Sequence, residues 1–304
     1  MYKIISSVIV ILFLGGCSTN VTKESSDLKR VFVYSDQVQI SYEVHGNGDS
    51  PVVFLHGFGA SVETWRDVQS RLAQKNKLYF LDLKGFGLSS KPDDGKYSLE
   101  DQADVVLAFI KAQDLHNVTL VGHSYGGAVC LFTYFKDRSN RDGAFIRRLV
   151  LIDAAAYVQN FPFFIDILRS PFMGWVVMHL IPAQTQASIT LNYLFHDANK
   201  LSEERISRYA EFFDQPGCYN SFAECAEQIV PANPDSITAL IRTIKAPSLI
   251  LWGADDPAIS VEHAYRLHKD IRNSRLAIIP DCGHNPHEEA PEESIKAILN
   301  FLEK

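Results

Sequence analysis

The sequence predicts an α/β fold in which a mostly parallel sheet is flanked by helices and interrupted by an inserted helical cap. Short apolar runs such as "PVVFLHG" (residues 51–57) alternate with amphipathic segments, as in parallel strands that are buried on both faces. From Tyr157 to about Asn233 the alternation stops and only helical patterns remain. With 304 residues, the chain can hold one core, over 31–155 and 236–304, and a cap over 156–235.

The first half of the chain supplies most of the predicted sheet. Residues 31–46 read as two strands with a break near Asp36, which predicts an antiparallel hairpin. Ser98, with Asp101 three residues later, predicts a helix start, and Ala103, Val106, Leu107 and Ile110 form one apolar face. The remaining runs predict strands at 51–57, 77–83, 117–124 and 147–155, and helices at 62–72 and 125–135.

The inserted segment is rich in aromatic residues and precedes two more strands. A helix is expected over Glu203 to Phe213, strands over 246–257 and 274–284, and a closing helix from about Glu292. Open α/β sheets bind ligands at the carboxyl ends of their strands, so the cap is expected to cover that edge. Its aromatic residues are either a pocket wall for an apolar group or a packed cap core; they are Phe161, Phe163, Phe164, Phe172, Trp175, Phe212 and Phe213.

The N-terminus is expected to be a targeting segment. Lys3 precedes an apolar run from Ile4 to Leu14, which is too short to span a bilayer and predicts a signal peptide over 1–16. The following "LGGCST" resembles the lipobox of bacterial lipoproteins. The resemblance implies a lipid anchor on Cys17, a tether over 17–30, and, from Ser18, the outer membrane of a Gram-negative cell. A conventional secretory signal with a chance cysteine is the alternative.

The net charge and the cysteine spacing limit which classes of partner the chain can bind. The net charge is −7 and no basic cluster is present, which argues against a nucleic-acid partner. Cys130, Cys218, Cys225 and Cys282 lack the spacing of a zinc site. Cys218 and Cys225 form either a disulfide or two buried thiols. The oligomeric state is left open.

A serine stands between a predicted strand and a predicted helix, in "GHSYG" (residues 122–126). A plain turn is one interpretation; the other is a nucleophile elbow, where small neighbours allow a strained serine backbone. A serine nucleophile needs a histidine base and an acid that orients the histidine. Downstream, "WGADDP" offers Asp255 and Asp256, and "DCGHNPHEEAPEE" offers His284 and His287, both after predicted strands.

Together, "HGFG", "DLKGFGLSS", "GHSYGG", "WGADDP" and "GHNPHEEAPE" resemble the α/β-hydrolase fold superfamily, specifically its capped serine-hydrolase branch of carboxylesterases, lipases and carbon–carbon hydrolases. The resemblance covers about Val31 to Lys304. It implies Ser124 as nucleophile, His284 as base and Asp256 as acid, with Asp255 as the alternative acid. His287 and Asp82 take structural roles in this interpretation.

The same resemblance implies the oxyanion hole. Its two donors are the backbone N–H groups of Phe58 and Tyr125, and their side chains are expected in the pocket wall. By itself, "HGFG" could be a plain tight turn with a structural histidine, His56, but the turn falls in register with the serine corner, which favours the oxyanion hole. Ser124 excludes the branches that use an aspartate nucleophile, and HGFG in place of HGGG argues against hormone-sensitive-lipase-like esterases. No cofactor and no metal are expected, since the three side chains suffice for the chemistry.

The expected function is therefore hydrolysis of a small-molecule carboxylic ester or lipid by a membrane-anchored enzyme. Carbon–carbon hydrolysis of an aromatic ring-cleavage product is the alternative; its dianionic substrate would need an arginine, for which Arg169 is the candidate. A lipoprotein that only binds its ligand is the remote alternative.

Overall fold

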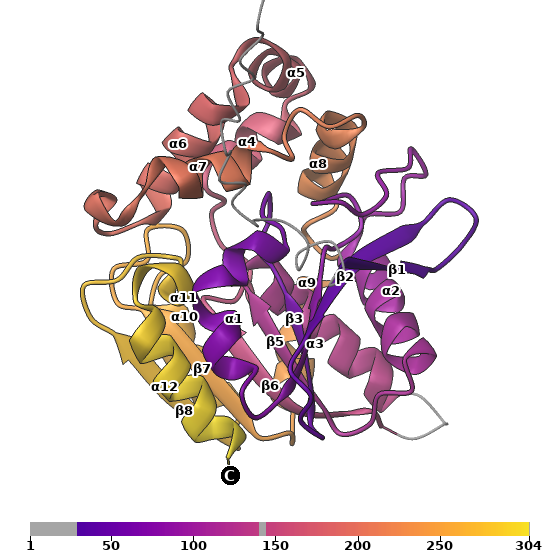
Figure 1. The fold of residues 1–304 in the computed structure, drawn as a ribbon, viewed down its shortest axis with the longest axis vertical. Helices are drawn as coiled ribbons and strands as arrows, with labels where there is room; N and C mark the ends of the chain where they lie inside the picture. Colours follow the sequence, from indigo (N-terminus) through magenta and orange to yellow (C-terminus); the bar gives the residue numbers. More distant parts are fainter. Residues whose placement is uncertain (1–28, 140–143, 304) are drawn as a thin grey trace, which may run out of the picture.

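The computed structural model describes residues 29–139 and 144–303, and within them eight strands form one sheet in the order β1-β2-β4-β3-β5-β6-β7-β8 (Figure 1). The first two strands and the β2–β4 pair are antiparallel, and every other pair is parallel. The strands are β1 (Lys29–Val33), β2 (Gln39–His45), β3 (Pro51–Leu55), β4 (Lys77–Leu81), β5 (Val118–His123), β6 (Ile146–Ile152), β7 (Ser248–Gly253) and β8 (Ser274–Ile279).

Helices cover both faces of this sheet, which confirms the predicted fold class. Helices α1 and α12 pack together in the core of one face, and α2, α3 and α10 contribute to the core of the other. The core helices are α1 (Arg66–Leu72), α2 (Leu99–Ala112), α3 (Tyr125–Arg138), α9 (Pro234–Ile241), α10 (Glu262–Asp270), α11 (Pro286–Glu289) and α12 (Pro291–Leu302), with a 3₁₀ turn at Val62–Trp65.

Strand β3 shows why the apolar runs are continuous. Val53 and Leu55 belong to one core cluster, whereas Val52 and Phe54 belong to the cluster on the opposite face. Successive side chains of a strand point to opposite faces, so a strand covered on both sides must be apolar at every position.

The N-terminal elements agree with the sequence pattern except at their edges. The hairpin is antiparallel as predicted, but β1 begins at Lys29, which pairs with Glu43, because the ladder extends into the segment expected to be tether. Ser98 and Asp101 form the capping box of α2. Leu107 is only half-buried, because the buried face of α2 contains Phe109 and Ile110 and leaves Leu107 at its edge. The expected signal peptide and Cys17 lie outside the described residues.

The inserted segment forms a layer of helices above the carboxyl ends of the strands, with α5 farthest from the sheet (Figure 1). Residues of α6 and α7 form a small core of their own. Helix α7 is shorter than predicted because the chain turns after Ala210. The helices of this layer are α4 (Phe163–Arg169), α5 (Pro171–Leu180), α6 (Ala183–Leu194), α7 (Glu203–Ala210) and α8 (Cys218–Glu227), with a 3₁₀ turn at Ala198–Lys200.

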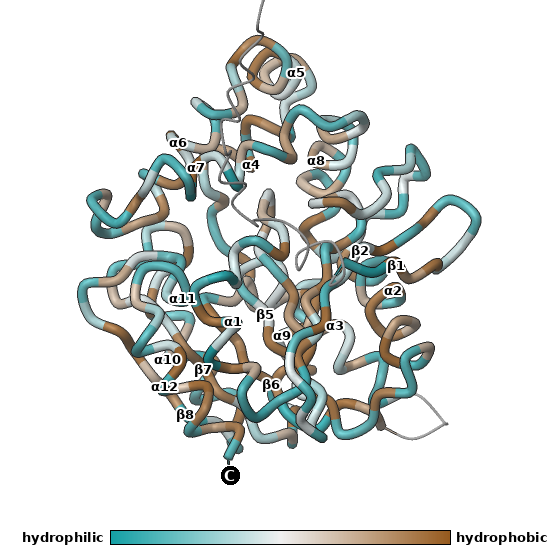
Figure 2. Tube along the Cα trace, in the orientation of Figure 1, coloured by the Kyte–Doolittle hydropathy of each residue, from teal (hydrophilic) through white to brown (hydrophobic). Residues whose placement is uncertain are grey.

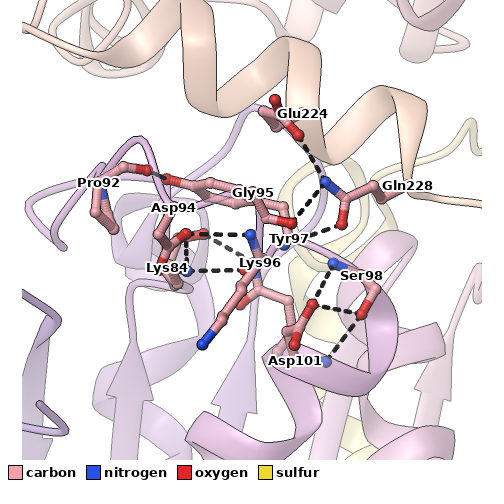
Figure 3. Close-up of polar contacts among 11 residues, drawn as sticks. Lys84, Pro92, Asp94, Gly95, Lys96, Tyr97, Ser98, Asp101, Glu224 and Gln228 are labelled. Atoms are coloured by element: carbon pink, nitrogen blue, oxygen red, sulfur yellow. Dashed lines mark hydrogen bonds and ion pairs between the residues drawn. The ribbon is translucent and has the colours of Figure 1, made fainter.

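Helix α8 is joined to the core by side-chain hydrogen bonds. Gln228, which caps its C-terminus, accepts from the backbone N–H of Tyr97 and donates to the carbonyl oxygen of Gly95, both at 3.2 Å (Figure 3). In the same loop, the Lys84 ammonium donates to the Asp94 carboxylate at 2.7 Å. The loop that contacts α8 is thus fixed just before the chain enters α2.

The four cysteines in the described part of the chain are free and buried, so Cys218 and Cys225 are thiols. Among the described residues, no single helix is long and apolar enough to cross a membrane; α4 and α5 meet that criterion only as a pair, bent by 109° at their junction.

Candidate active site

Ser124 sits at a sharp corner between β5 and α3. Its backbone has φ 52° and ψ −117°, a left-handed conformation that non-glycine residues rarely adopt. Its N–H donates to the carbonyl oxygen of Ile152 at 2.9 Å, and its own carbonyl accepts from the N–H of Ala155 at 3.0 Å. These bonds to the end of β6 hold the strained corner in place.

The glycines beside Ser124 permit close backbone packing. A Cβ atom at Gly126 would lie 2.3 Å from the carbonyl oxygen of Leu55, and one at Gly122 would lie 2.4 Å from that of Gly126. Neither contact is possible for a larger residue, so α3 can begin this close to β3 and β5 only with glycine at both positions.

His284 and Asp256 meet at the ends of β8 and β7. Nδ1 of His284 lies 2.8 Å from Oδ2 of Asp256, and both side chains are buried. The other Asp256 oxygen accepts from the N–H groups of Ala258 and Ile259 at 2.7 and 3.0 Å. With the Nδ1 proton directed at the carboxylate, Nε2 of His284 is left as a proton acceptor. Ser124 and His284 line the same pocket.

The alternative acid and base lie elsewhere. Asp255 is half-exposed and its carboxylate lies 3.6 Å from Nδ1 of His196. His287 is buried against Trp65, and its Nε2 lies 2.8 Å from the Thr64 hydroxyl. Burial lowers the pKa of His287 to about 3, so the ring is neutral at ordinary pH.

Asp82 and His56 hold loops together. The Asp82 carboxylate accepts from the N–H groups of Val62 and Leu88 at 2.8 and 2.9 Å, and burial raises its pKa to about 6. Nε2 of His56 accepts from the N–H of Leu83, so its protonated Nδ1 donates to the carbonyl oxygen of Gly57. Burial lowers the pKa of His56 to about 4. A neutral His56 therefore fixes the turn that leads to Phe58.

The rings of Phe58 and Tyr125 contact each other in the wall of the pocket next to Ser124. Their rings are 6.1 Å apart, and both residues line the pocket that holds Ser124 and His284. Within the described residues, neither backbone N–H has a hydrogen-bond acceptor in the protein. Two free N–H groups beside a serine are what an oxyanion site requires.

Asp153 is a buried acid that no sequence motif singled out. It follows β6, has φ 42°, and one carboxylate oxygen accepts from the N–H of Gly253 at 3.0 Å. Its second oxygen accepts no hydrogen bond from the described residues, and the carboxyl group lies within 4.8 Å of Asp256 and His284. Burial and the neighbouring Asp256 carboxylate hold the pKa of Asp153 well above its usual range. Its place at the end of "LVLID" was the available signal.

Two glutamates connect the His284 loop to the cap, and sequence patterns missed them too. Glu289 accepts from the N–H groups of Gly283, His196 and Asp197 at 2.7, 3.2 and 2.8 Å. Glu288 pairs with Arg205 of α7 at 2.8 Å. Both glutamates stand in the quoted "GHNPHEEAPE", so their place in the motif was visible although their contacts with the cap were not.

Two groups of described residues bring histidine and carboxylate atoms within 4.8 Å of one another, as a metal site would need: Asp153, Asp256 and His284, and the exposed set His196, Asp255 and Asp281. In the first group, Nδ1 of His284 and Oδ2 of Asp256 already hydrogen-bond each other. A metal there would have to displace that bond.

The pocket above Ser124, hereafter the serine pocket, is apolar. Within the part of the chain that the structure describes, its wall contains no Asp, Glu, Lys or Arg. Arg169 lies outside this wall, with its guanidinium over the ring of Phe161 at 5.2 Å. Core and cap both contribute to the wall, including Leu131, Phe132, Phe161, Phe164, Leu194 and Ile237.

Comparisons with known proteins place the chain among its relatives. It is 26% identical to the uncharacterized hydrolase YugF of Bacillus subtilis (strain 168), over 88% of this chain and 95% of that protein. It is 29% identical to the 2-hydroxy-6-oxo-6-(2'-aminophenyl)hexa-2,4-dienoic acid hydrolase of Metapseudomonas resinovorans, over 92% and 93%. An α/β hydrolase fold protein from Burkholderia ambifaria superposes with a TM-score of 0.78 at 27% identity, covering 90% of this chain and 98% of that one. Because the family profile also matches residues 52–297, the chain belongs to the Alpha/beta hydrolase family.

Proposed function

We propose that the chain hydrolyses carboxylic esters with an apolar acyl group, with Ser124 as nucleophile. The observation that carries this proposal is the serine pocket, whose described wall has no charged side chain although Ser124 and His284 both line it. An alkyl or aryl acyl group gains from burial there, whereas an anionic substrate would lose its hydration without a compensating charge.

In this proposal, acylation uses three side chains and two backbone groups. Oγ of Ser124 attacks the ester carbonyl carbon while its proton passes to Nε2 of His284. Asp256 accepts from Nδ1 and stabilises the imidazolium. The N–H groups of Phe58 and Tyr125 donate to the oxyanion. The bond to the alcohol oxygen then breaks, and His284 gives its proton to that oxygen.

Deacylation repeats these steps with water. A water molecule gives one proton to Nε2 of His284 and attacks the acyl carbon. The second tetrahedral intermediate uses the same two N–H donors. Its collapse returns the proton to Oγ of Ser124 and releases the carboxylic acid, so no cofactor is consumed.

Carbon–carbon hydrolysis is the second candidate, because one relative carries the name of a dienoic acid hydrolase. The same three residues could serve that reaction. Its substrate is an anion, however, and Arg169 lies outside the serine pocket. The geometry therefore favours the ester.

The test is turnover of p-nitrophenyl esters of increasing acyl length, with a coloured ring-cleavage product in parallel. Ser124→Ala is expected to reduce ester turnover about 10⁴-fold or more. Ser207→Ala, an exposed helix serine, is the matched control. Wild-type turnover no higher than that of Ser124→Ala would overturn the proposal, and preferential cleavage of the ring-cleavage product would establish the second candidate.

We further propose that Cys17 carries a lipid that attaches the enzyme to the outer membrane of a Gram-negative cell. The support is the apolar run at Ile4–Leu14 followed by "LGGCST". Cells fed a labelled fatty acid should yield labelled wild-type protein and unlabelled Cys17→Ser protein, with the wild type in the outer-membrane fraction. Equal labelling of both proteins would contradict the lipid site, and recovery in another fraction would contradict the location.

A further inference from the structure

The outer end of the cap presents an exposed apolar surface. We call it the cap tip and define it by α5 and the exposed residues that follow it. Of the α5 residues, only Gly174 is buried. Figure 2 shows the apolar colouring of α5 at the end of the molecule farthest from the sheet. The exposed apolar side chains of the cap tip are Phe172 (73% exposed), Leu180 (63%), Ile189 (53%), Trp175 (48%), Met173 (45%) and Ile181 (37%).

This surface is also uncharged. Charged residues make up 21% of the chain, yet the stretch from Ser170 to Phe195 contains no Asp, Glu, Lys or Arg. His179 is exposed, but its Nδ1 bonds the Trp175 carbonyl and its ring stacks on Trp175 at 5.0 Å. The surface of a soluble protein rarely combines a long uncharged stretch with several exposed apolar side chains unless it binds an apolar partner.

An apolar pocket leads inward from the cap tip toward Ser124. Its wall includes Val177, Ile181 and Ile189 at the tip and Phe58 at its inner end. Over the described residues, this wall also contains no charged side chain. It adjoins the serine pocket, because four residues line both: Phe58, Phe164, Leu194 and Tyr209.

We propose that the cap tip docks on the surface of a phospholipid bilayer, and that the pocket beneath it takes a lipid acyl chain from the bilayer toward Ser124. The second part rests on the proposed ester hydrolysis, whereas the docking does not. An acyl chain would then move between two apolar environments without crossing water, which removes the cost of exposing it.

The chemistry of the cap tip fits a bilayer better than a second copy of the chain. Protein interfaces have a polar rim and about one hydrogen bond per 100–200 Å², and this surface offers no charged group. Exposed Phe, Trp and Leu side chains on one helix, here Phe172, Trp175 and Leu180, are typical of insertion at a membrane interface. The proposed lipid site, Cys17, also lies close in the chain: the residues from Cys17 to Lys29 span at most about 43 Å when extended.

The chain carries its own reporter for docking. Trp175 is half-exposed, while the other two tryptophans, Trp65 and Trp252, are fully buried, and all three lie in the described residues. The full chain is reconstituted into phosphatidylcholine–phosphatidylglycerol vesicles, with and without brominated acyl chains. Bromine quenches only nearby tryptophans, so we expect quenching that Trp175→Phe abolishes.

A double variant tests the surface itself. F172Q/L180Q removes two apolar side chains that line neither pocket, and is expected to weaken docking about tenfold or more. Leu240→Gln, an exposed change on α9, should leave quenching unchanged. Trp175 that stays open to aqueous acrylamide and unquenched by bromine would overturn the docking. Trp175 shielded from both, with cross-linked dimers, would overturn it as well and show that a second copy covers the tip.

Hydrolysis tests the delivery of the acyl chain. The measured quantity is turnover of a long-chain ester in vesicles divided by turnover of soluble p-nitrophenyl butyrate. We expect this ratio to fall about tenfold in F172Q/L180Q and to stay constant in Leu240→Gln. An unchanged ratio in F172Q/L180Q, together with the expected loss of quenching in that variant, would overturn the delivery step. Absence of any Ser124-dependent ester cleavage would overturn the proposed function, and the quenching result would still decide the docking.

Discussion

Helices α5 and α8 belong to the same cap and have ten residues each, but they meet their surroundings in opposite ways. Helix α8 buries five residues against the core, including Phe222 and Ser221. Phe222 packs on Phe58 and Phe86, and the Ser221 hydroxyl donates to the carbonyl oxygen of Gly85 at 2.8 Å. Helix α5 buries only Gly174 and exposes Phe172 and Trp175.

The difference shows that the cap has two parts. Its inner part, which includes α8, is buried against the core and hydrogen-bonded to it, and we call it the fitted region. Its outer part, α5, is largely exposed. Apolar side chains of α8 enter the core, and polar side chains of α8 form hydrogen bonds to loops of the core. Contacts within this chain therefore determine where α8 lies. Helix α5 packs Met178 against the core but leaves Phe172, Trp175 and Leu180 exposed. In the docking proposed above, a bilayer supplies the apolar environment that these exposed side chains lack.

The largest expected effect comes from phenylalanine truncations on the two helices. Phe222→Ala leaves a cavity among aromatic rings and is expected to lower the free energy of unfolding by about 3–5 kcal/mol. Phe172→Ala, at 73% exposure, should change it by no more than about 0.5 kcal/mol. Urea unfolding of both variants measures the contrast. Similar losses for the two would show that α5 is packed in solution and would break the comparison.

The second prediction concerns Glu289, which fits the end of α6 to the His284 loop. Glu289→Gln replaces one acceptor oxygen by a donor, so at least one of the three N–H groups from Gly283, His196 and Asp197 loses its partner. We expect a loss of about 1–3 kcal/mol in stability. Because the N–H of His284 donates to the carbonyl oxygen of Leu194 at the end of α6, a looser contact between α6 and this loop should also lower kcat for the proposed ester hydrolysis.

Glu292→Gln is the matched control for this change. Glu292 is exposed and pairs with the exposed Arg71 at 3.3 Å, a contact expected to contribute no more than about 1 kcal/mol. Equal stability of the two variants would mean that the cap does not depend on Glu289, and the fitted region would then be limited to α8.

Sequence patterns predicted what depends on neighbours in the chain. The strands follow from local periodicity, and the capping box of α2 from the spacing of Ser98 and Asp101. The glycines around Ser124 by themselves indicated a sharp corner, because a strained serine backbone requires small neighbours. The contact between Asp256 and His284 could be expected because both follow parallel strands, whose carboxyl ends share one edge.

Contacts between distant segments that do not follow from the order of the parallel strands could not be predicted from the sequence pattern. An aspartate at the end of a strand gives no sign that it will face a second acid, so Asp153 was missed. The cap aromatics were ambiguous because exposed and buried apolar side chains look alike in a sequence. The structure divides them: Phe212 is buried, whereas Phe172 and Trp175 are exposed.

A smaller effect is expected from the polar contacts that seat α8. Gln228→Ala removes the hydrogen bonds to Tyr97 and Gly95 at the α8 C-terminus, and should lower stability by about 0.5–1.5 kcal/mol. Gln184→Ala, an exposed cap glutamine whose side chain reaches only neighbouring cap residues, should have no measurable effect. Thermal unfolding of the two variants measures the difference, and a neutral Gln228→Ala would assign the seating of α8 to Phe222 and Ser221 alone.

The pH dependence of stability tests Asp153, a buried acid of the core beneath the cap. Burial and the Asp256 carboxylate raise the pKa of Asp153 above its unfolded value, so the folded state retains the proton. That contribution to stability is complete below the unfolded pKa of about 3.9 and is lost as the pH rises through the folded pKa. Asp153→Asn keeps an acceptor for the Gly253 N–H and does not titrate. Urea midpoints measured from pH 4 to pH 8 should therefore fall less with rising pH in Asp153→Asn than in the wild type, whose other titrating groups are unchanged. Parallel curves would mean that Asp153 titrates normally in the folded protein. The core would then accommodate an ionised Asp153 carboxylate beside Asp256, although the Gly253 N–H is the hydrogen-bond donor that Asp153 has in the described residues.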